Sequence, residues 1–176
     1  LLRDWRPILA RAGVSGVLAR RAAERAAAMG TRFAEELLAS GEVAEGDLYR
    51  AIAADLGLGF AGVVDPDSVM ADQARRLASL RDRHGLRIAM LGNADGTTTH
   101  LIADPGIDPA AIRALLEGAP HLRAGIRIAP PSALRAAIVE RSTRRLLFDA
   151  QHRLLLQSPE FSARTVVSAW QGATAV

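Results

Sequence analysis

The stretch of residues 32–60 constrains the fold more than any other part of the chain. Apolar residues recur there at the spacing of an amphipathic helix on both sides of Gly41, and Gly57 follows the second run. Glycine accepts the left-handed backbone that ends a helix or closes a tight turn. The pattern therefore predicts two short helices, over residues 32–40 and about 46–56. Because no residue of this block has a catalytic context, we interpret the pair as a recognition or docking module.

The sequence on either side predicts helices before this pair and a mixed lobe after it. Residues 1–29 predict two helices, with Gly30 as the C-cap of the second. Further on we expect helices over residues 67–82, 109–117 and 130–156, and strands over residues 86–91, 97–103 and 122–129. This order predicts an α+β (mixed α/β) fold in which a β-β-α-β-α lobe of about three strands is covered by helices on one face.

We expect three parts along the chain, separated where its composition changes. They are a helical subdomain over residues 1–62, a small α/β lobe over residues 63–140, and a C-terminal helix and linker over residues 141–176. The first residue is not methionine and the last few residues have no closing element, so we expect a fragment of a longer protein.

Charge and residue usage exclude several classes of function. All 22 basic residues are arginines, and the net charge is only +3, which argues against a nucleic-acid partner. The chain has no cysteine, which excludes disulfides, thiolate zinc sites and cysteine nucleophiles. No apolar run is long enough for a membrane span.

The remaining residues give no reaction chemistry. The four histidines are not at metal-ligand spacing, and no phosphate-binding loop is present, because the glycines at 57 and 59 follow a helix instead of preceding one. Asp104 and Asp108 flank a Pro-Gly turn, where we expect a solvated loop. We therefore expect a chain that is not itself an enzyme, with no catalytic residue, no metal site and no bound cofactor.

The helix pair resembles a repeat found in the N-terminal domain of type II secretion and pilus assembly ATPases (the GspE N-terminal or MshEN type). The matching positions are Arg32, Phe33, Ala34, Leu37, Gly41, Val43, Leu48, Ala51, Ile52 and Asp55. The order of elements downstream is also similar, with Asp95-Gly96 in a hairpin turn and Asp104-Pro105 after the second strand. The resemblance covers about residues 32–140.

The resemblance implies which residues contact a ligand or partner. Some members of the family bind cyclic di-GMP, and a guanidinium can pair with phosphate and stack on guanine, so Arg32 is the candidate ligand contact. Gly41, Leu48 and Asp55 are further candidates for contact with a ligand or a partner. The family's repeat has glycine at Ala34 and glutamine at Asp55, so we expect docking in preference to nucleotide binding.

The C-terminal stretch points to a parent protein. Residues 148–171 resemble the linker that precedes the first membrane helix of bacterial family-2 glycosyltransferases carrying this same domain. A basic cluster lies beside that stretch. Three of its residues come before residue 148 and one lies within the stretch: Arg141, Arg144, Arg145 and Arg153. It is either a solvated helix face or a membrane-proximal contact with lipid headgroups or an acidic partner.

Three hypotheses follow. The first is a non-catalytic regulatory or docking domain on the cytoplasmic side of the inner membrane, within a glycosyltransferase that makes polysaccharide. The second is the same domain within a secretion or pilus ATPase, and the third is a cyclic di-GMP sensor in either parent. The expected partners are other domains of the parent protein or an inner-membrane protein.

Overall fold

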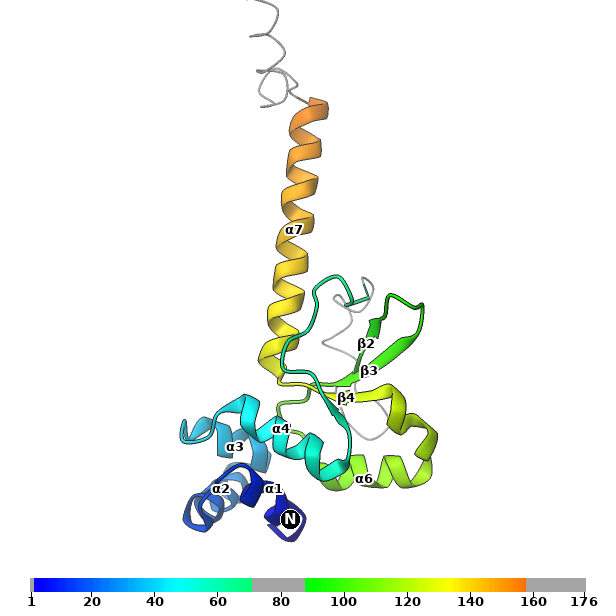
Figure 1. Cartoon of the computed structure of the whole chain (residues 1–176). Coiled ribbons are helices and arrows are strands. Elements are labelled where there is room, and N and C mark those ends of the chain that lie inside the picture. The colour runs from blue at the N-terminus through cyan, green and yellow to red at the C-terminus, as the bar shows by residue number, and fades with distance from the viewer. Residues whose placement is uncertain (1, 71–87, 158–176) are drawn as a thin grey trace, which may run out of the picture. The chain divides into compact units, whose positions relative to one another are not determined.

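The computed structural model describes residues 2–70 and 88–157, and their side chains up to residue 150 (Figure 1). The fold is α+β, as the sequence predicts. In chain order the described elements are α1 (Leu2–Arg11), α2 (Gly16–Met29), α3 (Phe33–Ala39), α4 (Glu45–Leu56), β1 (Gly59–Phe60), β2 (Ile88–Gly92), β3 (Thr98–Ile102), α6 (Pro109–Gly118), the 3-10 helix η1 (Pro120–Gly125), β4 (Ile126–Ile128) and α7 (Pro131–Gln157).

The three glycines that the sequence predicts as helix boundaries lie just after α2, α3 and α4. Ser15 accepts a hydrogen bond from the backbone of Leu18 and so begins α2. Gly30 and Gly57 both adopt left-handed backbone and close α2 and α4. Gly41, with φ of 72°, makes the turn between α3 and α4. The predicted helix pair and its glycine boundaries are therefore confirmed.

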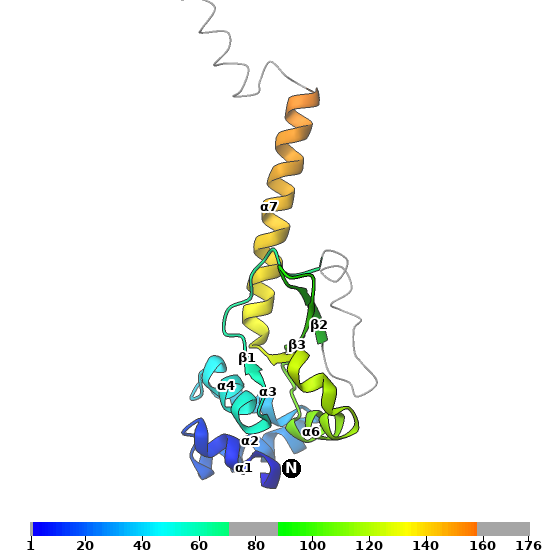
Figure 2. The ribbon, with the colours of Figure 1, turned by 45° about the vertical axis from the view of Figure 1, so that its right-hand side comes forward.

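The sheet has four described strands in the order β1-β4-β3-β2 (Figure 2). Strands β2 and β3 form the predicted antiparallel hairpin, whereas β4 pairs in parallel with both β3 and β1. The strand that the sequence did not predict is β1, a two-residue segment after α4. This segment is a strand because its backbone pairs with β4, which its own residues do not predict.

The sequence predicts a strand over residues 122–129, but the predicted start is wrong because the strand begins only at Ile126. Residues 120–125 form η1, and the strand is confined to Ile126–Ile128. The parallel pairing of β4 with β3 begins at Ile126, opposite His100, although β3 itself begins at Thr98. Arg123 within η1 instead donates a hydrogen bond to the carbonyl oxygen of Leu56, 2.7 Å away, at the end of α4.

The helix expected over residues 67–82 does not begin where predicted. Residues 66–68 form a turn, and Val69 then forms an isolated antiparallel bridge with Leu91. The amide of Gly92 donates to the carbonyl oxygen of Ser68 at 2.8 Å, so this segment lies against the edge of β2. The rest of the predicted helix, residues 71–82, lies outside the described residues.

Two apolar clusters cover the two faces of the sheet. The larger one joins α1–α4 and α6 to the face that carries Ile102 and Ile128. The smaller one lies on the opposite face, where Leu101 and Ala129 pack with Leu134 at the start of α7. The expectation of helices on one face only is thus wrong, because the first turns of α7 bury apolar side chains against the second face.

The chain divides into two compact units, Leu1–Ile138 and Val139–Val176. The boundary falls within α7, whose first turns contribute Leu134 and Ala137 to the smaller cluster of the first unit. The predicted division at residues 62 and 140 stays a prediction. No helix in the described part of the chain is both long and apolar enough to cross a lipid bilayer.

Candidate binding site

Arg32 connects the helical part of the first unit to the loop after β3. The residue precedes α3, and its amide donates to the side chain of Glu35, which closes the first turn. Its Nη1 donates to the carbonyl oxygen of Gly106 at 2.8 Å and to Oδ2 of Asp104 at 3.3 Å. The side chain of Arg32 keeps 42% of its area exposed. Arg32 therefore ties the start of α3 to the loop after β3 while part of its side chain stays at the surface. We call Arg32, Asp104 and Gly106 the clamp.

The side chain of Arg32 passes close to Gly106. A Cβ built at Gly106 would lie 2.0 Å from Cδ of Arg32, well inside van der Waals contact. A side chain at this position would have to displace the arginine from its present path, whereas glycine leaves that path open.

Asp104 is the buried centre of this clamp, although we expected a solvated loop there. The residue is only 4% exposed. One carboxylate oxygen accepts from the amide of Gly106 at 3.0 Å, and the other accepts from Arg32. Burying a carboxylate is costly unless charges and hydrogen bonds compensate it, and here they do. Asp108 does lie at the surface, where it accepts from the amide of Ala110 and begins α6.

Tyr49 completes the clamp from α4. Its buried hydroxyl donates to the carbonyl oxygen of Asp104 at 2.5 Å. Burial, with the nearby carboxylates of Glu45 and Asp104, raises the pKa of the phenol well above its ordinary value. The hydroxyl therefore stays protonated and keeps its role as donor at neutral pH. The only sequence signal for this residue is its position on a predicted helix.

A pocket of about 470 Å³ opens beside the clamp. Three regions far apart in the sequence line it: α1 through Trp5, the last turns of α2, and the segment from Gly106 to the first turn of α6. Its wall is mostly apolar, and Arg32, Thr31 and Asp108 supply the polar side chains. A mostly apolar hollow with a few converging polar groups is the usual form of a binding site.

Two packed aromatic rings line one side of the pocket. Trp5 and Phe33 contact each other edge to face, with ring centroids 4.9 Å apart, and both side chains are almost completely buried. The α2 wall consists of Ala23, Ala26 and Ala27, whose small side chains leave the space open. The pocket therefore has a closely packed aromatic side and an open alanine side.

The structure brings together Arg32 and the loop at 104–108 but separates the other candidate residues. Leu48 is completely buried in the larger apolar cluster, so in this fold it offers no surface to a ligand. Gly41 is exposed in its turn and does not line the pocket. Asp55 forms an ion pair with Arg113 of α6, with 2.7 Å between Oδ2 and Nη2.

The basic cluster belongs to the second unit. Arg144 forms an ion pair with Glu140 at 2.5 Å, and Arg145 lies 4.0 Å from Asp149. Arg141 is half-buried, and Arg153 falls in the part of α7 whose side chains are not described. Part of the predicted positive charge is thus balanced along the helix itself.

The chain is similar to solved structures of other proteins. No family model matches the chain, and no curated protein matches it. A solved structure described as "Structure of MshE with cdg" is similar over 76% of this chain and 95% of that one, with 24% sequence identity and a TM-score of 0.49. At this level the likeness assigns no function, and the proposals below rest on the residues of this chain.

Proposed function

We propose that this chain is a non-catalytic regulatory or docking domain whose binding site is the pocket beside Arg32. The observation that carries the proposal is the joint construction of that pocket by α1, α2 and the segment from Gly106 to α6. An occupant would contact the helical part and the sheet-bearing part together. The pocket would therefore give a domain without chemistry of its own a site at which an occupant engages both parts at once.

The parent protein that we propose is a bacterial inner-membrane glycosyltransferase of polysaccharide synthesis, with this domain on its cytoplasmic side. Support comes from the resemblance of residues 148–171 to the linker before a membrane helix. The alternative parent is a secretion or pilus assembly ATPase, supported by the repeat at residues 32–60. The gene sequence after Val176 separates the two, because a hydrophobic span supports the first and a P-loop supports the second.

Docking is tested by closing the pocket without touching the clamp. Ala27 is exposed and lines the pocket, so Ala27→Leu fills the space with a side chain that needs no room in the core. Ala54→Leu is the matched control, since Ala54 is exposed on α4 and is not part of that pocket. We expect the first change, and not the second, to alter the rate of the full-length parent enzyme. Equal rates for both variants would contradict the proposal.

Cyclic di-GMP is the second candidate occupant, and the exposed guanidinium of Arg32 at the pocket favours it. Both described hydrogen bonds of that side chain use Nη1, so the guanidinium retains donors for phosphate or a face for a guanine base. The carboxylate of Asp55 would repel a phosphate ligand if it were unpaired. Its ion pair with Arg113 balances that negative charge.

Isothermal titration of cyclic di-GMP into the folded chain tests this candidate. Binding should release heat, and both Arg32→Ala and Ala27→Leu should abolish it. Arg50→Ala is the control, because Arg50 is exposed, pairs with Asp47 and does not line the pocket. The absence of heat at high micromolar ligand would remove the dinucleotide and leave the docking proposal to its own test.

A further inference from the structure

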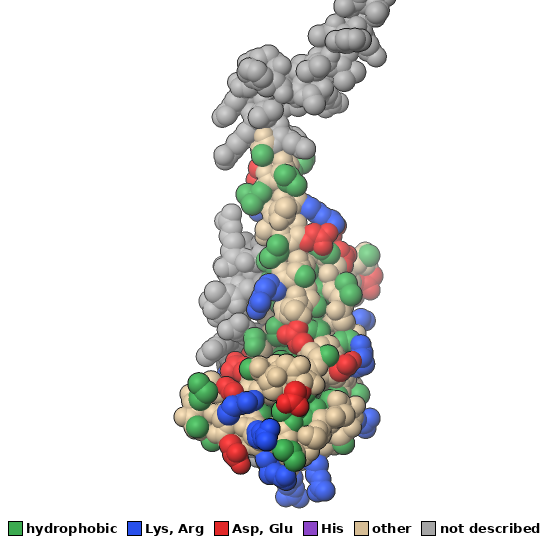
Figure 3. Space-filling model, turned by 90° about the vertical axis from the view of Figure 1, so that its left-hand side faces the viewer, with side chains coloured by type: hydrophobic (Ala, Val, Ile, Leu, Met, Phe, Trp, Pro, Cys, Tyr) green, Lys and Arg blue, Asp and Glu red, His purple; other side chains and the backbone are tan. Residues whose placement is uncertain are grey.

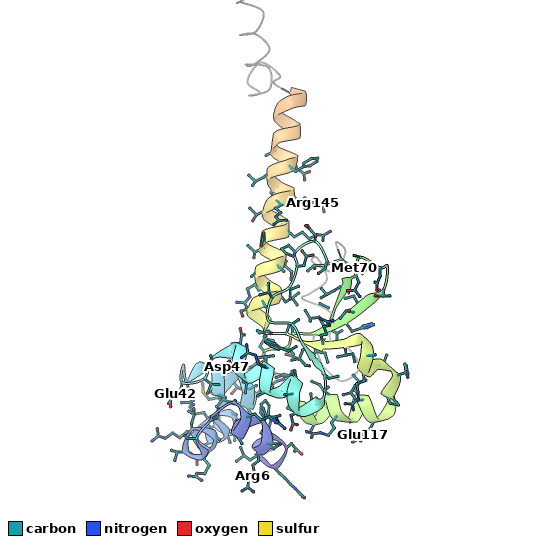
Figure 4. All side chains as sticks on the ribbon, in the orientation of Figure 1. Arg6, Glu42, Asp47, Met70, Glu117 and Arg145 are labelled. Atoms are coloured by element: carbon teal, nitrogen blue, oxygen red, sulfur yellow. The ribbon has the colours of Figure 1, made fainter. Side chains whose placement is uncertain are left out.

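Helices α1 and α2 carry an excess of positive charge. Together they contain six arginines and two carboxylates: Arg3, Arg6, Arg11, Arg20, Arg21 and Arg25 against Asp4 and Glu24. All six arginines are exposed. Figure 3 shows blue side chains gathered at the end of the first unit where these helices lie. In Figure 4, Arg6 extends from α1 on the side away from the sheet.

Most of this charge is not balanced by the described part of the chain. Arg25 pairs with Glu36 at 3.3 Å, but the other five arginines form no ion pair with any described residue. Elsewhere in the first unit, Arg32, Arg50 and Arg113 each have a carboxylate within 4 Å. Arg123, Arg127 and Arg135 form no ion pair with a described residue, but they are not gathered on two adjoining helices. Helices α1 and α2 therefore present positive charge that an anionic partner can neutralise.

Apolar side chains are exposed among these arginines. Val17 is 53% exposed and Met29 is 70% exposed, at opposite ends of α2, and Leu2 is exposed at the start of α1. The aromatic rings of this region, Trp5 and Phe33, are buried and offer no surface for stacking on nucleic-acid bases. The combination of cations with scattered aliphatic side chains fits a lipid interface better than a nucleic acid.

We propose that the exposed faces of α1 and α2, named the α1–α2 surface, dock on the anionic headgroups of a lipid bilayer. The arginines come from two helices, so they offer several separate contacts to an extended anionic plane. Each arginine near such a plane adds electrostatic attraction, and the exposed Leu2, Val17 and Met29 can enter the headgroup region. This inference does not depend on the pocket or its occupant.

Vesicle co-sedimentation of the full chain tests the proposal. The protein should bind vesicles of phosphatidylglycerol mixed with phosphatidylcholine, bind pure phosphatidylcholine weakly, and dissociate as salt is raised. The double change Arg20→Gln with Arg21→Gln should lower the partition coefficient roughly tenfold to thirtyfold. Arg3→Gln with Arg6→Gln on α1 should act in the same way, and keeps the test decisive if the first pair impairs folding.

The matched control is Arg127→Gln with Arg135→Gln, which removes the same charge from exposed positions of the first unit outside the α1–α2 surface. It should retain binding within about a factor of two. Equal loss in the control and in the α1–α2 variants would mean that net charge alone attracts the protein, and would overturn the proposal. Absence of binding to phosphatidylglycerol, equal binding to both vesicle types, or undiminished binding of both α1–α2 variants would overturn it as well.

Discussion

Arg32 and Gly106 are 74 residues apart in the sequence, yet Nη1 of the arginine lies 2.8 Å from the carbonyl oxygen of the glycine. This contact fixes the start of α3 to the loop between β3 and α6. It also explains two residue choices at once, because the arginine supplies the donor and the glycine leaves the space through which the arginine passes. Both residues line the pocket that we propose as the binding site.

Gly106→Ala should destabilise the fold by about 1–3 kcal/mol, because the added methyl overlaps the Arg32 side chain and displaces its hydrogen bonds. Urea unfolding measures the loss. Gly118→Ala is the control, since a methyl added there meets no atom within 4 Å beyond its own helical turn, and it should be neutral or slightly stabilising. If the clash is the cause, Gly106→Ala should cost much less in a chain that already carries Arg32→Ala.

Tyr49 should make stability depend on pH in the alkaline range. Because burial raises the pKa of the phenol, the folded protein keeps the proton where the unfolded chain releases it. The contribution is fully present below the ordinary phenol pKa of 10.0 and is lost as the pH rises above it. The free energy of unfolding should therefore fall in that range. Tyr49→Phe should remove this pH dependence, which chemical denaturation at a series of pH values would detect.

The same titration has a direct optical readout. The chain has one tyrosine, and its basic residues are all arginines, which do not titrate in this range. Tyrosinate absorbance should appear only together with loss of the helical circular dichroism signal. Ionisation of the phenol at its ordinary pH in a protein that is still folded would contradict the buried position of Tyr49.

The ion pair between Asp55 and Arg113 should contribute to stability more than an exposed pair does. The Asp55 side chain is only 11% exposed, so replacing Arg113 with methionine should leave a nearly buried carboxylate unpaired and cost about 1–3 kcal/mol. The comparison is the exposed pair of Asp47 and Arg50, whose coupling should be below about 1 kcal/mol. Double-mutant cycles measure the coupling energy of each pair. Equal coupling energies would show that burial does not strengthen the pair of Asp55 and Arg113.

Leu48 should behave as a core residue and not as a contact residue. Leu48→Ala should cost about 2–5 kcal/mol in thermal or urea unfolding, because it leaves a cavity among fully buried side chains. Leu147→Ala, at a position 58% exposed, should change stability little. A stable Leu48→Ala protein with altered partner or ligand binding would instead return Leu48 to the candidate binding residues.

The local elements were largely predictable because their causes are local. The helix pair, its glycine boundaries and the β2–β3 hairpin follow from periodicity and turn residues within a few positions of each other. The errors fall where pairing decides the outcome. Residues 120–125 form η1 and do not pair with the first residues of β3, whereas Gly59–Phe60 has little strand character of its own but gains a partner in β4.

The candidate site divides in the same way. The sequence by itself determined that Arg32 stands at the start of a helix, that glycine breaks the helices, and that an Asp-Pro-Gly turn follows a strand. Only the tertiary structure decided that Arg32 meets that turn, that Asp104 is buried, and that Tyr49 donates to it. The reason is physical: helix and turn formation depend on neighbouring residues, but the compensation of a buried carboxylate depends on groups brought together from distant parts of the chain.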